Sequence, residues 1–273
     1  MAKYILITGC NGFVGSNLVK YLHSKKYKIN CIERNFDKNK IEGMVKNSNV
    51  IIHLAAIINP FDKDIWNINV NYTKFLVEMT KKYNRNFIYL STQNVLFGKD
   101  NYSRTKFQAE NIVRTLKDFV ILRPTIIYGK NESRYIGKLI KIIKKSPVIP
   151  ILGSGKYKLQ PIHIGDLIKI IEYCIKNKIR GIFLVAGKSR IAYNELIDLI
   201  IKKLRLKRMK LYMPIFFIRP FAYLFQNLLK NPPVTTVQLD NIKVDQVYDT
   251  NIIEKTFNIK LKNIEDGIDL LIK

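Results

Sequence analysis

The 273-residue sequence has only three cysteines, and its 21 acidic residues face 47 lysines and arginines. Cys10, Cys31 and Cys174 are too few, too scattered and odd in number for a disulfide framework or a spaced metal site. The N-terminus has no basic leader followed by a long apolar core, so a secretory signal is not expected. These shortages favour a reducing compartment, and we expect a cytoplasmic protein without a resident metal ion.

The positive charge, formally +26 at pH 7, raises the question of nucleic-acid binding. The basic residues are spread along the whole chain and no nucleic-acid-binding motif accompanies them, so nucleic acid is not an expected partner. A positive field would instead attract an anionic cofactor or substrate, or hold the protein near anionic lipid. The composition is otherwise that of a globular protein, with 47% hydrophobic residues.

Short β-branched runs alternate with longer helical patterns in the first half of the chain. This rhythm predicts an α/β fold with a doubly wound, Rossmann-like parallel sheet. The runs are almost wholly apolar, which is typical of strands buried on both faces. Strands are expected at Tyr4–Thr8, Ile29–Glu33, Val50–Leu54, Phe87–Leu90 and Phe119–Leu122, with helices at Ser16–Lys25, Ile68–Tyr83 and Ser103–Leu116.

The rhythm breaks after Pro124, where glycine and proline punctuate shorter elements. One more apolar strand at Ile182–Val185 and a helix at Tyr193–Leu204 follow. We therefore expect two interleaved domains. Residues 1–128 form the first, with 161–187 returning to its sheet, and residues 129–160 and 188–273 form a smaller second domain.

The segment Leu211–Leu229 is strongly apolar and aromatic, but it contains Pro214, Arg219 and Pro220. It is therefore a poor candidate for a spanning helix, which needs about 20 apolar residues. The favoured interpretation is a core or lid helix pair of the second domain. The alternative is an anchor that lies in the membrane interface.

Glycines follow the first predicted strand directly and open a helix, in the run Thr8-Gly9-Cys10-Asn11-Gly12-Phe13-Val14-Gly15. They permit a tight turn and a close approach of the backbone to a pyrophosphate, and the helix N-terminus supplies amide donors. The strand before and the helix after make a dinucleotide site the favoured interpretation over an ordinary glycine turn. The cofactor-binding residues expected here are Gly9, Asn11, Gly12, Phe13, Val14 and Gly15.

Glu33 ends the second predicted strand, near the position at which an acidic residue binds the adenosine ribose hydroxyls. This residue favours NAD over NADP. Its neighbour Arg34 would suit the 2′-phosphate of NADP, so NADP is the second option. The alternative without a binding role is that Glu33 and Arg34 form a solvated pair.

Tyr102 and Lys106 lie four residues apart on a predicted helix, which puts them on one face. A neighbouring ammonium favours the phenolate, so the tyrosine can exchange a proton with a carbinol. Thr92, at the end of the fourth predicted strand, can hold the substrate oxygen. We expect these three residues to be catalytic.

Several segments resemble the NAD-dependent epimerase/dehydratase family, a group of extended short-chain dehydrogenases. The resemblance rests on Thr92 with Tyr102 and Lys106, and on the segments Thr8–Gly15, His53–Ala56, Asn69–Thr73, Leu122–Pro124 with Tyr128-Gly129, and Pro161–Asp166. It implies that Leu54, Ala55, Ala56 and Pro124 border the cofactor and that Asn69 supports the site. It also implies that Tyr102 and Lys106 contact the cofactor, with Lys106 on the nicotinamide ribose. His53 and His163 are expected to be structural.

Departures from the family pattern narrow the expected activity. Gln93-Asn94 stands where dehydratases carry Asp-Glu, and the interval from Thr92 to Tyr102 is short. Ile126 and Leu159 stand where many members have a substrate-side Asn and an Arg that binds the substrate diphosphate. Lys156, Lys158 or Gln160 would have to take the place of that Arg. We expect an NAD(P)-dependent epimerase or reductase of a nucleotide-activated sugar such as a UDP-hexose. The sequence leaves open whether the protein is a homodimer. A non-catalytic dinucleotide-binding scaffold, membrane-associated through Leu211–Leu229, is the alternative.

Overall fold

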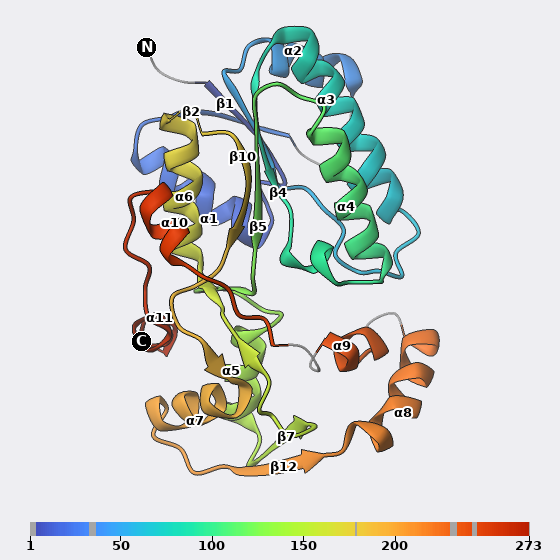
Figure 1. Cartoon of the computed structure of the whole chain (residues 1–273), viewed down its shortest axis with the longest axis vertical. Helices are drawn as coiled ribbons and strands as arrows, with labels where there is room; N and C mark the ends of the chain where they lie inside the picture. The colour runs from blue at the N-terminus through green and yellow to red at the C-terminus, as the bar shows by residue number, and fades with distance from the viewer. Residues whose placement is uncertain (1–3, 33–36, 178, 230–233, 242–244, 273) are drawn as a thin grey trace. The chain divides into compact units, whose positions relative to one another are not determined.

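The computed structural model (Figure 1) describes residues 4–32, 37–177, 179–229, 234–241 and 245–272. The chain forms two compact units. The first comprises Met1–Pro124, Ile164–Val185 and Asn251–Lys260, and the second comprises Thr125–His163, Ala186–Thr250 and Leu261–Lys273. The two units are therefore interleaved along the chain.

The segment 251–260 lies in the first unit, although the sequence placed it in the second domain. Its helix α10 (Asn251–Thr256) is followed by Phe257, which is fully buried. The Phe257 ring packs edge-on against Phe183 of the last sheet strand, at 5.1 Å between centroids, and against Tyr173 at 5.8 Å. Phe257 therefore attaches this segment to the first unit. The sequence did not reveal this contact, because Phe257 follows polar residues and its partner Phe183 is distant in the chain.

The first unit is built on a six-stranded parallel sheet in the order β2-β1-β3-β4-β5-β10. This confirms the doubly wound, Rossmann-like α/β fold. Ile5, Leu6 and Ile7 are all fully buried although successive strand residues face opposite sides, so both faces of β1 are covered. The strands are β1 Tyr4–Thr8, β2 Lys28–Ile32, β3 Val50–His53, β4 Asn86–Leu90, β5 Phe119–Pro124 and β10 Gly181–Val185.

Helices cover both faces of this sheet (Figure 1). The first group is α1 (Phe13–Ser24), α6 (Ile164–Lys176) and α10, and the second is α2 (Lys38–Lys46), α3 (Tyr72–Tyr83) and α4 (Asn101–Val113). A π-helical turn over Asn67–Asn71 leads into α3, and a 3-10 turn over Gln93–Leu96 follows β4.

The strand order reverses between β1 and β3, because β1 is paired with both β2 and β3. The connections that leave the carboxyl ends of β1 and β3 therefore run in opposite directions. In open α/β sheets ligands bind at such a reversal. The glycine run follows β1 and the segment Leu54–Ala56 follows β3, so both predicted cofactor segments lie there.

The second unit contains three short strand pairs and helices that share a separate hydrophobic core. Two helices, α5 (Ile136–Lys145) and α7 (Tyr193–Lys203), contribute Ile140, Ile143, Ile197 and Ile200 to this core. The paired strands are β6 (Ile127–Tyr128) with β9 (Ile162–His163), β7 (Val148–Leu152) with β12 (Met209–Met213), and β8 (Lys158–Leu159) with β11 (Ile191–Ala192). The helices are α5 Ile136–Lys145, α7 Tyr193–Lys203, α8 Ile215–Leu228, α9 Thr236–Asn241 and α11 Ile264–Ile272.

The segment Leu211–Leu229 completes β12 and forms α8, which carries Pro220 inside it. α8 does pair with a second helix, α9. Its aromatic side chains, however, face outward: Phe216 is 82% exposed. The core half of the core-or-lid interpretation is therefore wrong for this segment, and a role as a lid stays a prediction. Among the described residues, we find no helix with the length and apolarity needed to cross a membrane.

Candidate active site

The glycine run forms a tight turn at the carboxyl end of β1. Gly9 has a φ of +75°, and a Cβ there would lie 2.8 Å from the Ala55 backbone nitrogen. A Cβ on Gly15 would lie 2.1 Å from the Gly9 carbonyl oxygen. Because both positions leave no room for a side chain, the turn keeps the start of α1 close to the segment after β3.

Thr8 joins the two segments that flank the strand reversal. Its Oγ1 accepts hydrogen bonds from the backbone nitrogens of Leu54 and Ala55, both at 3.2 Å. The same oxygen lies 2.6 Å from Nδ1 of His53. The hydroxyl thus fixes the glycine turn against the segment Leu54–Ala56.

His53 is a fully buried structural residue, as the sequence suggested. Its Nε2 lies 2.9 Å from Oγ1 of Thr73, and its ring stacks on Tyr89 at 5.5 Å between centroids. Burial, with the charge of Lys106 as a smaller cause, lowers the pKa of His53 to about 3. The ring is therefore uncharged at neutral pH, and both of its nitrogens are already engaged by threonine hydroxyls.

Asn69 links the segment after β3 to the helix that carries Tyr102 and Lys106. Its Oδ1 accepts from the Ile57 nitrogen at 2.8 Å, and its Nδ2 donates to the Ile57 carbonyl at 2.9 Å. Nδ2 also donates to Oγ1 of Thr105 on α4, at 3.0 Å. The side chain is buried and all its polar atoms are used, so Asn69 holds the segment after β3 against α4.

Lys106 lies in the interior with a relative exposure of 2%. Its Nζ donates to the Leu90 carbonyl at 2.7 Å and lies 4.0 Å from the centroid of the Tyr89 ring. Burial lowers the pKa of Lys106 to about 7, and the negative charge of Glu110 opposes this shift. The ammonium is therefore held at the carboxyl end of β4 and is easily deprotonated.

Tyr102 and Thr92 lie close to the same strand end. Tyr102 is half-buried in the first turn of α4, and its charge contributes to a raised pKa of Tyr89, behind the larger effect of burial. Thr92 is almost fully buried and caps the 3-10 turn by accepting from the Asn94 nitrogen at 3.2 Å. Tyr102 and Lys106 share α4, and Thr92 begins the 3-10 turn that follows β4.

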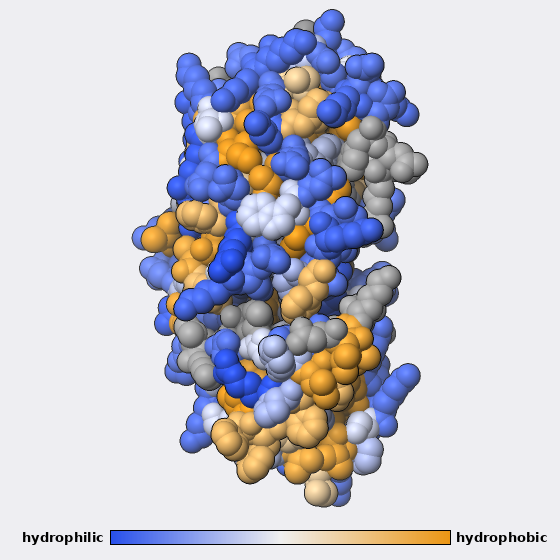
Figure 2. Space-filling model, turned by 90° about the vertical axis from the view of Figure 1, so that its right-hand side faces the viewer, coloured by the Kyte–Doolittle hydropathy of each residue, from blue (hydrophilic) through white to orange (hydrophobic). Residues whose placement is uncertain are grey.

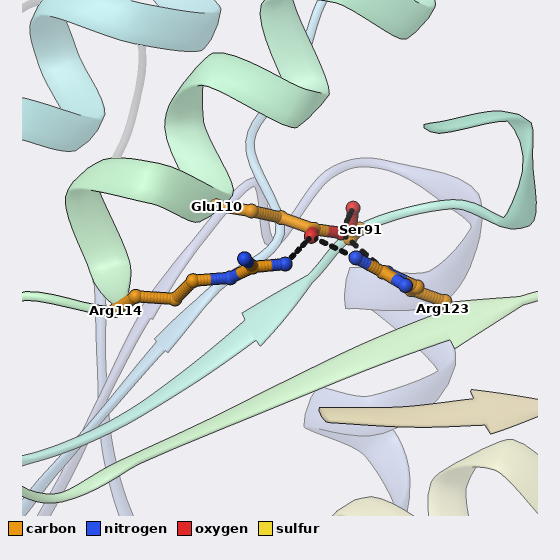
Figure 3. A network of polar contacts seen from close by, with 4 residues as sticks. All are labelled: Ser91, Glu110, Arg114 and Arg123. Carbon is orange, nitrogen blue, oxygen red and sulfur yellow. Dashed lines mark hydrogen bonds and ion pairs between the residues drawn. The ribbon is translucent and has the colours of Figure 1, made fainter. Parts of the chain in front are cut away.

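A buried ion network fixes α4 against β4 and β5 (Figure 3). The Glu110 carboxylate is fully buried; it accepts from Ser91 Oγ at 2.6 Å and from Arg123 Nε at 2.9 Å. Arg114 lies 3.4 Å from the same carboxylate. The sequence placed Arg123 in a family motif but gave Glu110 no role, because no local pattern pairs residues so far apart in the chain.

The residues at the strand reversal fit a dinucleotide. The backbone cradle of Gly9 and Gly15 would be filled by a Cβ, which is what a closely bound pyrophosphate requires. Asn11, Gly12, Phe13 and Val14 line the turn and the first turn of α1, where amides suit an anion. Leu54–Ala56 follow β3, and Pro124 ends β5. Glu33 and Arg34 lie outside the described residues, so the choice between NAD and NADP stays a prediction.

A disulfide joins Cys10 of the glycine turn to Cys31 of β2, with their Cα atoms 6.1 Å apart. The sequence argued against a disulfide framework, and it did not anticipate this single pair. The cause is the parallel register of the sheet, since Ile7 lies beside Cys31 and the glycine turn folds back over it. Cys174 is free and buried.

The proposed substitutes for the substrate-side Arg are not equivalent. Gln160 accepts from the Tyr248 nitrogen at 2.6 Å and donates to the Gly187 carbonyl at 2.8 Å, so it is a structural residue. Leu159 is buried, and Ile126 packs against the core of the second unit. Lys156 and Lys158 are exposed and stay available for an anion.

The parallel sheet with its glycine turn at the strand reversal is the arrangement of a dinucleotide-binding α/β protein. The model of the NAD dependent epimerase/dehydratase family matches residues 5–186, and the chain belongs to that family. The family resemblance and the nicotinamide cofactor inferred from the sequence are thereby confirmed.

Characterised relatives cover most of the chain. It is 26% identical to a UDP-glucose 4-epimerase of Vibrio cholerae, over 82% of this chain and 83% of that protein. It is 23% identical to the N-acetyl-alpha-D-glucosaminyl-diphospho-ditrans,octacis-undecaprenol 4-epimerase of Escherichia coli O157:H7, over 78% and 76% of the two chains.

Solved structures share the fold over nearly the whole chain. A dTDP-4-dehydrorhamnose reductase of Bacillus anthracis, in complex with NADP, has a TM-score of 0.79 at 18% identity and 98% coverage of both chains. A UDP-glucuronic acid 4-epimerase of Bacillus cereus, in complex with UDP-glucuronic acid and NAD, has a TM-score of 0.77 at 20% identity and covers 98% of this chain and 97% of its own.

Proposed function

We propose that the chain is an NAD-dependent epimerase of a nucleotide-activated sugar such as a UDP-hexose, with a reductase of the same substrate class as the alternative. The observation that carries the proposal is the placement of Lys106. Its buried Nζ lies at the end of β4, on the helix that also presents Tyr102 and next to the strand end that presents Thr92. The family membership and the Vibrio cholerae relative support the same activity.

The chemistry assigned to the three side chains follows from their types and places. Tyr102 takes the proton of a sugar hydroxyl and returns it, and the Lys106 ammonium favours the phenolate form that does so. The Thr92 hydroxyl holds the same substrate oxygen. Bound at the glycine turn, NAD would supply the acceptor and donor of hydride for that carbinol carbon.

A dehydratase is disfavoured by the residues after Thr92. Water elimination needs an acid and a base beside the sugar, and this chain has Gln93 and Asn94 there. Gln93 is almost fully buried, and the Asn94 backbone closes the 3-10 turn. Neither side chain can exchange a proton at neutral pH.

The test starts from the purified full-length protein. Denaturation should release NAD in near-stoichiometric amount, and the folded protein should interconvert UDP-hexose epimers without added dinucleotide. A reductase would instead consume added NADH or NADPH in proportion to product. Binding of NAD without turnover of any sugar nucleotide would overturn the proposal in favour of the scaffold.

A second candidate substrate is a sugar carried on a polyprenyl diphosphate, the class that the Escherichia coli relative is named for. The observation that favours it is a pocket of about 450 Å³ in the second unit, because its wall includes Lys156 and also Ile215, the first residue of the exposed helix α8. Asp245 lines the same pocket, but its carboxylate accepts from the Lys158 nitrogen at 2.8 Å.

This candidate is tested by competition. Polyprenyl-diphosphate N-acetylhexosamine and the matching UDP-sugar are offered together in detergent, and epimerised product is measured for each. A higher kcat/KM for the lipid-linked sugar, lost on Lys156→Gln, would establish it. Equal turnover of the UDP-sugar by Lys156→Gln and the unmodified protein would leave the nucleotide-sugar proposal in place.

A further inference from the structure

The strand β12 and the helix α8 present an unusually apolar surface. Phe216 is 82% exposed, and Met209 and Leu228 are each 70% exposed. Soluble proteins rarely expose contiguous apolar patches of more than a few hundred Å² without a binding function. We call this the β12–α8 surface, and its exposed members are Met209, Leu211, Tyr212, Phe216, Phe217, Phe221, Tyr223, Leu224 and Leu228. Figure 2 shows hydrophobic side chains gathered over this part of the second unit.

α8 is inverted relative to an ordinary surface helix. Its polar side chains are turned toward α9: Arg219 pairs with Asp240 at 3.0 Å, and Gln226 accepts from the Thr236 hydroxyl at 2.9 Å. Ala222 is fully buried on that side. The outward stripe runs Phe217, Phe221, Leu224 and Leu228 at helical spacing. A helix that faces water carries the opposite pattern.

A polybasic segment leads directly into this surface. Six of the nine residues from 202 to 210 are lysine or arginine. Lys203 and Lys210 pair with Asp269 and Asp198, whereas Lys202, Arg205 and Lys207 are exposed. An aromatic, apolar helix face beside several basic residues is the chemistry of a peripheral contact with anionic lipid.

The same charge argues against a second copy of the chain as the occupant. A symmetric pair would place the two apolar faces together and would bring the two polybasic segments near one another. Like charges across an interface oppose such a pairing. Anionic headgroups neutralise the segment, so charge complementarity selects the lipid.

The length of α8 defines how it would lie. Its 14 residues are about 21 Å long at 1.5 Å per residue, which is shorter than the hydrocarbon core of a bilayer at about 30 Å. The helix is therefore suited to lie in the interface and not to cross it.

We propose that the β12–α8 surface docks the protein on the surface of an anionic lipid bilayer. The outward stripe of α8 enters the boundary between headgroups and acyl chains, and Lys202, Arg205 and Lys207 contact the lipid phosphates. This docking does not depend on which sugar the enzyme uses.

The test is co-sedimentation of the full-length protein with vesicles of phosphatidylcholine alone or with phosphatidylglycerol. The unmodified protein should bind the anionic vesicles. Phe217→Ser with Phe221→Ser should weaken binding at least tenfold, and this loss should persist at high salt because apolar insertion is not screened. The matched control is Phe61→Ser, which changes an exposed phenylalanine of the first unit.

Charge is tested separately. Lys202→Gln, Arg205→Gln and Lys207→Gln together should weaken binding about 100-fold at low salt. Lys20→Gln, Lys74→Gln and Lys81→Gln remove the same charge from exposed positions of the first unit and should have a much smaller effect. A loss equal to that of the first triple variant would mean that net charge alone drives binding, and would overturn the proposal.

Amide hydrogen exchange of the unmodified protein tests the same proposal without any variant, so the test does not depend on the variants folding. Anionic vesicles should protect the segment 209–229 and leave α3 and α4 unchanged. Failure to bind anionic vesicles at low salt would overturn the proposal. So would a lipid-free dimer that Phe217→Ser with Phe221→Ser dissociates, because a second copy would then cover the face.

Discussion

The candidate active site of the first unit and the β12–α8 surface of the second unit place polar and apolar groups in opposite ways. Around α4 the polar groups are inside: Lys106 and Glu110 are both buried, and each has a partner within 2.7 Å. Around α8 the apolar groups are outside, and the polar Arg219 and Gln226 are turned toward α9. Burying a charge and exposing an aromatic ring both cost free energy relative to the ordinary arrangement.

Departures from ordinary packing indicate where a protein acts. A buried ammonium with a lowered pKa at a strand end is a chemical feature, because nothing in the folding of the sheet requires it. An exposed aromatic stripe is an interaction feature, because packing within the chain does not use it. Each departure points to one activity, and a substitution in one region should leave the activity of the other region intact.

The largest expected effect is at Tyr102. Tyr102→Phe keeps the ring and removes the proton-transfer oxygen, so turnover should fall by roughly 10²–10⁴-fold. Steady-state assay of the epimerisation measures this, and Tyr4→Phe, at the far end of β1, is the matched control. NAD affinity should change little, because phenylalanine keeps the ring, and vesicle binding should be unchanged. Near-normal turnover of Tyr102→Phe would mean that another group moves the proton.

The second effect concerns the buried charges that position α4. Glu110→Ala would leave the guanidinium of Arg123, 14% exposed, without its carboxylate. Removing one partner of a buried pair typically lowers the free energy of unfolding by about 3–5 kcal/mol. Urea denaturation measures the loss, which should be smaller in Glu110→Gln because the amide oxygen still accepts one hydrogen bond. Glu78→Ala, exposed on α3, should change stability by no more than about 0.5 kcal/mol.

Much of the first unit could be predicted from the sequence, because its signals are local. Apolar runs such as Ile5–Ile7 predict the strands. The glycines at positions 9 and 15 predict the tight turn, because neither position has room for a side chain. The helix that carries Tyr102 and Lys106 is likewise predicted from a local pattern, in which these two residues lie four positions apart. These features depend on residues within about ten positions of one another.

The remainder depends on contacts between distant positions. Glu110 gains its role from Ser91 and Arg123, and Cys10 gains its partner from the pairing of β1 with β2. In α8 the apolar content was correctly noted, but composition cannot say whether a face is covered. Only the position of α9 on the polar side shows that the aromatic stripe is left outside.

The third prediction concerns pH and Lys106. In the folded protein burial lowers the pKa of this group to about 7, and in the unfolded chain it has its ordinary value near 10.4. Between these values the unfolded chain holds a proton that the folded protein does not. The free energy of unfolding should therefore rise with pH across this window, by at most about 1.4 kcal/mol per unit.

The measurement is urea denaturation at several pH values between 7 and 10, for the unmodified protein and for Lys106→Met. The difference between the two slopes isolates the contribution of Lys106. The kcat/KM should fall as pH rises above about 7, since the ammonium form is the one that favours the phenolate of Tyr102. Parallel slopes for the two proteins would mean that the buried amine stays protonated throughout.

The smallest effect is the one that distinguishes the two regions most directly. Phe216→Ala removes a ring that is 82% exposed, whereas Ile197→Ala empties a fully buried position of the same unit. The second change should cost about 2–5 kcal/mol of unfolding free energy, and the first should stay within about 0.5 kcal/mol in the absence of lipid. Thermal or urea denaturation of both variants in detergent-free buffer makes the measurement. With anionic vesicles present, the unmodified protein should gain stability through binding and Phe216→Ala should gain less. A large loss for Phe216→Ala without lipid would show that the stripe packs against protein in solution, and the contrast between a site that buries charge and a surface that exposes rings would no longer hold.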